Sequence, residues 1–143
     1  MKARHKGREL ALQTLYALDF NQELQAGIPQ GFPGLSDLEI QSIEPEAILF
    51  ARYLIVGTLE HLDEVDQLIG EFSTNRPLDR IDIIDRNILR FSVYSLLYAN
   101  DIHSHVIIDE AVKLSQEFSS EVNYKFINGI LDSMQKRLRN DKS

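Results

Sequence analysis

The segment that runs from Leu78 to Tyr98 is the feature that most constrains the fold. Its sequence is LDRIDIIDRNILRFSVYSLLY, in which charged residues at the start give way to a helix that is apolar on almost every side. A helix that is apolar all round has to be covered by other helices. Its charges, among them Asp79, Arg80 and Arg90, are expected to gather at one rim of the fold. The segment therefore predicts a buried central helix in a bundle that presents its charged end to a partner.

Apolar residues recur at helical spacing along most of the chain. The predicted helices span about 8–21, 45–59, 62–73, 85–99, 105–118 and 123–139, with a short helical turn at 79–82. Pro45 suits the first position of its helix, and Pro77 interrupts the apolar stripe before the central helix. We find no strand-like alternation longer than a few residues and no repeat of fixed period. Six to seven helices packed as bundles predict an all-α fold.

The segment 22–44 is predicted to be a mobile loop, because it holds three glycines and two prolines. Within it, the sequence from Ser36 to Glu39 resembles a capping box, so a short helix is expected there. A length of 143 residues is enough to bury a sizeable core. We therefore predict a single helical domain over residues 1–143 that includes this loop.

Cysteine usage and hydropathy limit the class of protein. The chain has no cysteine, which excludes disulfides, thiolate metal sites and a cysteine nucleophile. Its basic start, from Met1 to Arg8, leads into an amphipathic helix and not into the apolar core of a signal peptide. No apolar run approaches the roughly 18 residues that cross a bilayer. We expect a cytoplasmic protein with no membrane contact.

The net charge of −7 argues against nucleic-acid binding, but the distribution of the charge does not. Residues 1–22 hold four basic and two acidic residues, residues 23–75 hold ten acidic residues and Arg52, and residues 76–143 hold ten of each sign. The basic start and the arginine-rich C-terminal half can bind a polyanion while the acidic middle faces elsewhere. The same pattern fits a solvated acidic face, so the charge leaves both interpretations open.

Several kinds of catalytic site are excluded by spacing. The glycine pair Gly31 and Gly34 is followed by no Lys-Ser or Lys-Thr, so there is no phosphate-binding loop. His103, His105 and Asp109 could form a metal site, but a polar connector into a helix is the favoured interpretation. No Ser/His/Asp set stands out by its order. We predict that the chain is not an enzyme and has no cofactor and no metal site.

The N-terminal arm is the clearest feature that favours nucleic-acid binding. Its basic residues Lys2, Arg4, Lys6 and Arg8 alternate with small or neutral residues. An extended arm of this kind gains affinity mainly by contacting phosphates. An exposed, solubilising N-terminus is the competing interpretation of the same residues.

Gln13 and Tyr16 follow the arm by one to two helical turns. A partly exposed Tyr16 could stack on an unpaired base, and Gln13 could hydrogen-bond to a base edge. The competing interpretation makes Tyr16 a core residue with only its hydroxyl at the surface, and the residues alone favour it.

Two features in the C-terminal half are interpreted as structural. Asp82 and Asp85 alternate with Arg80 and Arg86, which favours surface ion pairs over a catalytic carboxylate pair. Gly129 lies within a predicted helix, where glycine costs roughly 1 kcal/mol relative to alanine. We expect another helix to pack closely at Gly129, with a bound ligand as the alternative.

Four motifs, in order, resemble the NusB family of transcription antitermination factors. They are RELALQTLY at 8–16, LDRID at 78–82 with DRNILR at 85–90, HVIIDEAVKLS at 105–115, and KFINGILD at 125–132. Their order and spacing match across nearly the whole chain, and the loop at 22–44 is the divergent part. The end of the chain soon after the last helix favours the stand-alone factor over the related helical domain fused to RNA cytosine methyltransferases.

The resemblance implies a fold of two small helical bundles packed across each other. It implies binding of the single-stranded boxA element of nascent ribosomal RNA, as a heterodimer with NusE, a ribosomal small-subunit protein. That pair would join the RNA polymerase antitermination complex, promote read-through and support rRNA processing. An unoccupied partner surface would favour a homodimer of the free chain. The alternatives are a helical protein-interaction domain and a trans-acting accessory of an RNA cytosine methyltransferase, neither with specific RNA binding of its own.

The resemblance also implies which residues contact RNA. Carried onto this sequence, they are Lys2, Arg4, Lys6, Arg8, Gln13, Tyr16, Asp85, Arg86 and Phe126. The chain departs from the family pattern at three places. Lysine, histidine and glycine interrupt what is a richer arginine run in relatives, and lysine lacks the bidentate geometry of arginine. Val122 stands where relatives often have a second acid, and the pair at 76–77 replaces one that contains an aromatic residue.

Overall fold

The computed structural model describes residues 2–74 and 76–139. Over these residues the chain forms seven α-helices and one 3-10 helix, with no strand, so the prediction of an all-α fold with six to seven helices is confirmed. The chain divides into two compact units, Met1–Glu60 and His61–Ser143. None of the described helices combines the length and the apolarity needed to span a membrane.

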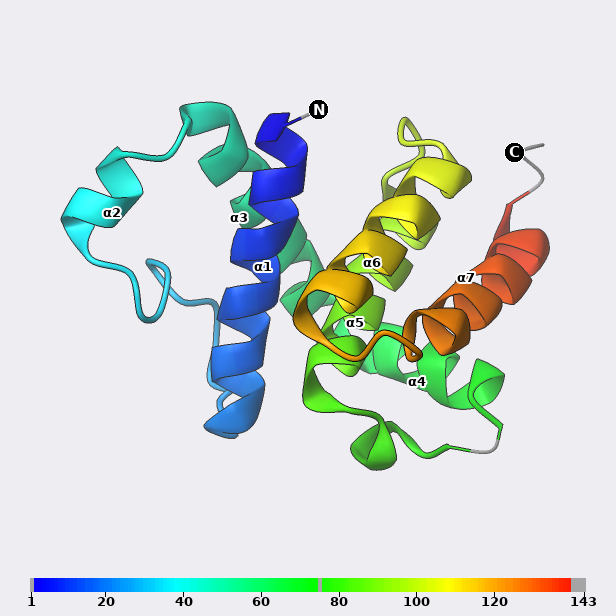
Figure 1. Ribbon diagram of the computed structural model, residues 1–143. Coiled ribbons are helices and arrows are strands. Elements are labelled where there is room, and N and C mark those ends of the chain that lie inside the picture. The colour runs from blue at the N-terminus through cyan, green and yellow to red at the C-terminus, as the bar shows by residue number, and fades with distance from the viewer. Residues whose placement is uncertain (1, 75, 140–143) are drawn as a thin grey trace. The chain divides into compact units, whose positions relative to one another are not determined.

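Unit 1 is built on two long helices. Helix α1 (Lys2–Phe20) packs along α3 (Pro45–Glu60), and the short α2 (Asp37–Gln41) precedes α3 in the chain (Figure 1). The two long helices come close at Gly7, where an added Cβ would lie 3.0 Å from the carbonyl oxygen of Ala47 and 3.0 Å from Cδ2 of Phe50. Glycine at this position lets α1 approach the backbone of α3.

The segment between α1 and α3 is held at several points. Arg52 of α3 donates a hydrogen bond of 2.7 Å to the carbonyl oxygen of Pro29, and Phe32 is buried. The predicted capping box is confirmed, since Ser36 Oγ accepts from the Glu39 N–H and Glu39 Oε1 accepts from the Ser36 N–H. The hydrogen bond that the Glu39 carboxylate accepts from the Ser36 backbone, and to a smaller extent the interaction with the Ser36 side chain, lower the pKa of Glu39. The mobility of the loop stays a prediction.

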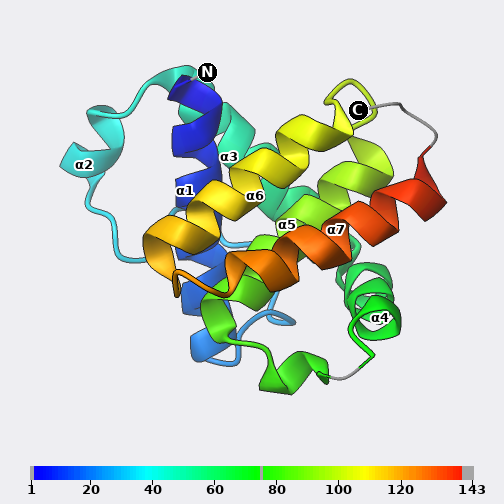
Figure 2. The same ribbon diagram turned by 45° about the vertical axis from the view of Figure 1, so that its right-hand side comes forward.

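Unit 2 surrounds one central helix. Its elements are α4 (Leu62–Phe72), the 3-10 helix η1 (Leu78–Arg80), α5 (Ile83–Tyr98), α6 (Ser104–Phe118) and α7 (Tyr124–Leu138). Helix α5 contacts α4, α6 and α7 (Figure 2). Every residue of α5 from Asn87 to Leu96 is buried. The prediction of a buried central helix is confirmed.

The charges at the start of α5 form the expected exposed rim only in part, because Asp79, Arg80 and Asp82 are exposed whereas Asp85 and Arg90 are buried. Asp82 is the N-cap of the helix and accepts a 2.9 Å hydrogen bond from the Ile84 N–H. Asp85 is 1% exposed and Arg90 is 4% exposed, so the interpretation of Asp85 as a surface ion-pair residue is wrong. The guanidinium of Arg90 instead donates hydrogen bonds to both carboxylate oxygens of Asp66 on α4, at 2.8 and 3.2 Å. Their positions on α5 place Asp85 and Arg90 in the interior, where residues distant in sequence supply their hydrogen-bond partners.

The other end of α5 is closed by Arg139. The guanidinium of Arg139 donates hydrogen bonds of 2.6–2.9 Å to the carbonyl oxygens of Ser95, Leu96, Ala99 and Ile102. The last carbonyls of a helix have no partner within the helix. One side chain after α7 therefore satisfies the C-terminal end of α5 and the turn that follows it.

Candidate nucleic-acid interface

One face of α1 gathers four of the predicted RNA-binding residues. Lys2, Lys6, Gln13 and Tyr16 are all exposed. With 3.6 residues per turn, these four positions fall within an arc of about 80° around the helix axis. Their side chains therefore form one stripe along α1, with the lysines at its start and Gln13 and Tyr16 further along. We call these four residues, together with Phe20 described next, the α1 stripe.

Aromatic side chains end this stripe. Tyr16 is 36% exposed, so the interpretation of Tyr16 as a core residue is wrong. Phe20 follows by one helical turn and is 67% exposed. The two rings are parallel within 4°, with centroids 6.1 Å apart. The last turns of α1 thus expose two parallel aromatic rings, of which only Tyr16 was predicted to contact RNA.

Arg4 and Arg8 lie outside the α1 stripe. Their helical positions are on a different side of α1, and their guanidinium carbons lie 4.9 and 5.0 Å from the ring centroid of Phe50 on α3. Arg8 is only 4% exposed. Arginine that stacks on an aromatic ring in this way contributes to packing as well as charge. The structure therefore separates the four basic residues of the N-terminus into two pairs.

The N-terminal basic segment is helical from Lys2 onward, so the expectation of an extended arm is wrong. Lysine, alanine and arginine are good helix formers. Gly7, which weakens a helix by itself, is used here for close packing against Phe50. The contacts with α3 therefore accompany a helix that begins six residues before the predicted start.

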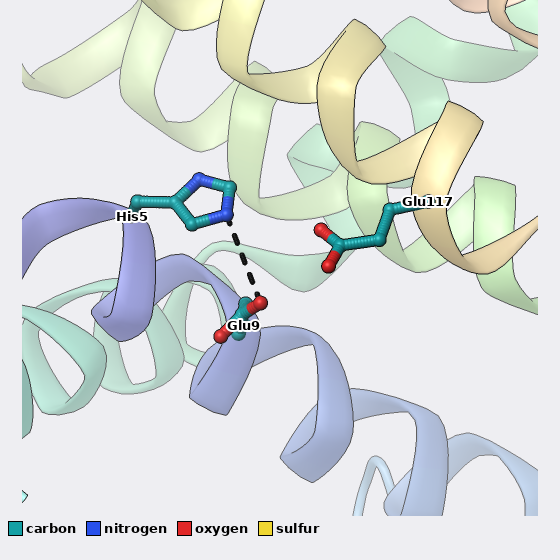
Figure 3. A group of neighbouring side chains, drawn as sticks. All are labelled: His5, Glu9 and Glu117. Atoms are coloured by element: carbon teal, nitrogen blue, oxygen red, sulfur yellow. Dashed lines mark ion pairs between the residues drawn. The ribbon is translucent and has the colours of Figure 1, made fainter. Parts of the chain in front are cut away.

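Glu9 lies beside the lysine end of the stripe. Its carboxylate is 3.7 Å from Nε2 of His5 and 3.7 Å from Nζ of Lys6. Figure 3 shows His5 and Glu9 with their pairing as a dashed line. Such partly exposed pairs at i,i+3 and i,i+4 spacing contribute little to stability. They leave the Lys6 side chain half-exposed, at 49%, and able to exchange this partner for a phosphate.

A second candidate surface lies in unit 2, around Phe126. A groove of about 530 Å³ runs between the end of α4 and the first turns of α7. Arg76 lies over the Phe126 ring at 4.2 Å, and the exposed Lys125 lines the same groove. Gly129 also lines it, with no atom within 4 Å of where its Cβ would be. The expectation of close helix packing at Gly129 is therefore wrong, and the missing side chain leaves the groove open.

Asp85 and Arg86, two further predicted RNA-binding residues, make hydrogen bonds within unit 2. Asp85 accepts 2.9 Å hydrogen bonds from the hydroxyls of Ser115 and Ser119 and from Nδ2 of Asn123. Since Asp85 is 1% exposed, its carboxylate connects α5 to α6 and α7. Arg86 is half-buried and donates a 3.3 Å hydrogen bond to the carbonyl oxygen of Ile81. We therefore leave Asp85 out of the candidate interface, and the contact of Arg86 with RNA stays a prediction.

The residues that the sequence analysis missed are Phe20 and Arg76. Phe20 shares the helical phase of Gln13 and Tyr16, which the sequence contains, but its role depends on where α1 ends. Arg76 comes just before Pro77, and nothing in the local pattern predicts that it lies over a ring fifty residues later. The helical spacing of Phe20 could therefore have identified it from the sequence, whereas no sequence signal identifies Arg76.

Comparison with known proteins identifies relatives of this chain. A model of the NusB family matches residues 5–136. The transcription antitermination protein NusB of Myxococcus xanthus is 42% identical over 132 residues, which cover 92% of this chain and 94% of that protein. Relatives of this kind are named as antitermination proteins, in agreement with the prediction that the chain is not an enzyme.

Solved structures share the fold. NusB of T. maritima is 31% identical with a TM-score of 0.77, and the match covers 93% of this chain and 90% of that one. NusB in a crystal structure with NusE and double-stranded RNA has a TM-score of 0.76 at 23% identity, with 96% of this chain and 98% of that one covered. The family match, the 42% identity and the common fold extend over nearly the whole chain. This chain therefore belongs to the NusB family of transcription antitermination proteins.

Proposed function

We propose that this protein binds the single-stranded boxA element of nascent rRNA as a heterodimer with NusE, and so promotes read-through by RNA polymerase and rRNA processing. The observation that carries the proposal is the α1 stripe, which sets exposed lysines, an exposed amide and exposed aromatic rings in one line. The cytoplasm, where transcripts are made in bacteria, is the proposed location.

The α1 stripe has the chemistry that single-stranded RNA requires. Proteins recognise unpaired bases by stacking them on aromatic rings and by hydrogen bonding to their edges. Tyr16 supplies a ring, and Gln13, one turn before it, supplies an amide with both donor and acceptor. Lys2 and Lys6 lie about 15 Å or more from Tyr16 along the helix axis, at 1.5 Å per residue. Phosphates and bases of one strand would thus meet different parts of the stripe.

The proposal includes a protein partner, because this chain has few basic residues that can contact RNA phosphates. Its net charge is −7, and only two lysines belong to the stripe. A basic ribosomal protein would add positive potential and contact area to the RNA surface. The protein of the same fold that was crystallised with NusE and double-stranded RNA supports the choice of NusE as that partner. Without NusE, two copies of this chain would form a homodimer through the surface that otherwise binds NusE.

The experiment that tests the proposal is RNA binding by fluorescence anisotropy. Labelled boxA-type RNA and a scrambled strand would be titrated with this protein, with and without NusE, at several salt concentrations. We expect preference for the boxA strand, tighter binding with NusE, and a salt slope that falls by roughly 1.4 when both stripe lysines are replaced by alanine, at about 0.7 per phosphate contact on a single strand.

Lys113 supplies a matched control for these lysines. It lies on α6 and pairs with Glu110 at i,i+3 and 3.6 Å, just as Lys6 pairs with Glu9 at i,i+3 and 3.7 Å. Lys113→Ala should leave the affinity and the salt slope unchanged. Equal affinity for both strands would contradict boxA recognition. Binding of NusE with no RNA affinity at any salt concentration would favour the alternative of a protein-interaction domain.

A further inference from the structure

Phe20 is the exposed aromatic side chain at the end of the α1 stripe, and the proposed function assigns it no contact of its own. We propose that Phe20 and Tyr16 together form a platform on which two successive RNA bases stack, with Phe20 receiving the second base. This inference rests on the proposed RNA binding and adds a specific contact to it. It assigns a role to a phenylalanine that is 67% exposed and is not needed to fill a core.

The geometry of the two rings suits stacking. They are parallel within 4° and their centroids are 6.1 Å apart. Phe20 is four positions after Tyr16, which is a rise of about 6 Å along the helix, a distance that successive nucleotides of an extended strand can match. Stacking on aromatic rings tolerates every base, because every base has a π face. Two parallel rings one helical turn apart can therefore accept two neighbouring bases in the same orientation.

The end of α1 holds Phe20 in place. The side chain of Asn21 donates a 2.9 Å hydrogen bond to the carbonyl oxygen of Ala17, and Gln22 turns the chain with a positive φ of 59°. The N–H of Glu23 then donates a 2.7 Å hydrogen bond to the carbonyl oxygen of Leu18. These contacts fix the last turn of the helix, so the ring projects from a defined backbone and not from a frayed end.

The charges around the rings favour bases over phosphates as the ligand. No lysine or arginine occurs between Glu9 and Phe20, and the charged residues nearest to Phe20 in the sequence are the acidic Asp19 and Glu23. Phosphates would be repelled there, whereas they would be attracted at Lys2 and Lys6. A protein surface docking on the rings would gain from their apolar area alone. RNA explains both the aromatic end and the basic end of the same stripe, so we favour it.

The experiment uses 2-aminopurine, whose fluorescence falls when it stacks on an aromatic ring. The base would be placed singly at each position of a boxA-type strand and bound to the complex of this protein with NusE. We expect quenching at two neighbouring positions. Phe20→Leu should restore the fluorescence of one of them and weaken binding by about five- to a hundredfold, which corresponds to the loss of one stacked base. Tyr16→Leu should restore the other position.

Two controls separate the outcomes. Leu38→Ala removes another exposed apolar side chain, 78% exposed on α2, and should change neither signal. Circular dichroism should show Phe20→Leu to be as stable as the unaltered protein. If the unaltered complex binds RNA but Phe20→Leu changes neither fluorescence nor affinity, the platform is refuted and the proposed function stands. If Phe20→Leu weakens only NusE binding or self-association, the ring is a protein contact and the platform is again refuted. If the unaltered complex binds no RNA, the proposed function itself fails.

Discussion

Replacing Asp85 by alanine is the sharpest test of how this fold uses its charges. The carboxylate is 1% exposed and accepts three hydrogen bonds of 2.9 Å, two from serine hydroxyls on α6 and the turn after it and one from Asn123 before α7. It also lies in the first turn of α5, where the helix dipole favours a negative charge. Three helices of unit 2 therefore meet at one side chain.

The size of the effect follows from these contacts. A hydrogen bond to a charged group is worth about 1.5–3 kcal/mol net, and a buried donor left without a partner costs about 1–3 kcal/mol. Ser115 is 0% exposed and would lose its partner, whereas Ser119 and Asn123 are half-buried and can turn toward water. We therefore expect Asp85→Ala to lower the free energy of unfolding by about 3–5 kcal/mol, a large part of the roughly 5–15 kcal/mol of a typical domain.

Urea denaturation followed by circular dichroism measures this change. Asp79→Ala is the matched control, since Asp79 is exposed on η1 and its loss should alter stability by less than about 0.5 kcal/mol. Asp85→Asn keeps the shape and one acceptor, so it should cost less than Asp85→Ala. A stability of Asp85→Ala within about 0.5 kcal/mol of the unaltered protein would refute the reasoning. So would an Asp85→Asn variant of unchanged stability that has lost RNA binding, because the carboxylate would then be a recognition group.

Three further predictions concern other contacts. Arg139→Lys should lower the free energy of unfolding by about 2–3 kcal/mol, because lysine cannot reach all four carbonyls. The control Arg137→Lys, at an exposed position, should change it by less than about 0.5 kcal/mol. Thermal denaturation of the two variants measures the difference. The hydrogen bond to Glu64 raises the pKa of Tyr98, so its stabilising contribution is present below the ordinary value near 10 and is lost as the pH rises through the raised value. Glu64→Gln should therefore move the titration of Tyr98 to lower pH, as followed by absorbance at 295 nm. Gly7→Val should destabilise the fold by about 1–3 kcal/mol, because its side chain would meet the backbone of α3, and a normal melting temperature would contradict this.

Most of the fold could be predicted from apolar spacing and from helix signals. The α5 segment is apolar on nearly every side, and that property alone required helices around it. Pro45 begins α3 and the capping box at Ser36 begins α2, as their local sequences indicated. These signals work because each depends on residues within one or two helical turns.

The fate of buried charges could not be predicted in the same way. Arg90 pairs with Asp66, 24 residues earlier in the chain, and Asp85 is satisfied by residues 30 to 38 positions later. From the sequence, the nearest opposite charges of Asp85 are its neighbours, so a surface ion pair was the natural interpretation. Only the packing of α6 and α7 against α5 brings hydroxyl and amide donors to the carboxylate. A neutral donor set of this kind leaves no pattern in a single sequence.

Helical phase divides the basic residues of the N-terminus into two pairs, and we propose that only the lysine pair contacts RNA. Four cations in eight residues look equivalent when the segment is imagined as extended. Once α1 begins at Lys2, the two lysines share the phase of Gln13, Tyr16 and Phe20, while the two arginines turn toward Phe50. Arginine suits that second place because its flat guanidinium stacks on a ring, and lysine suits the first because its flexible ammonium can follow a phosphate. The two lysines and two arginines of the N-terminus fit this division between the proposed RNA contact and the packing against Phe50.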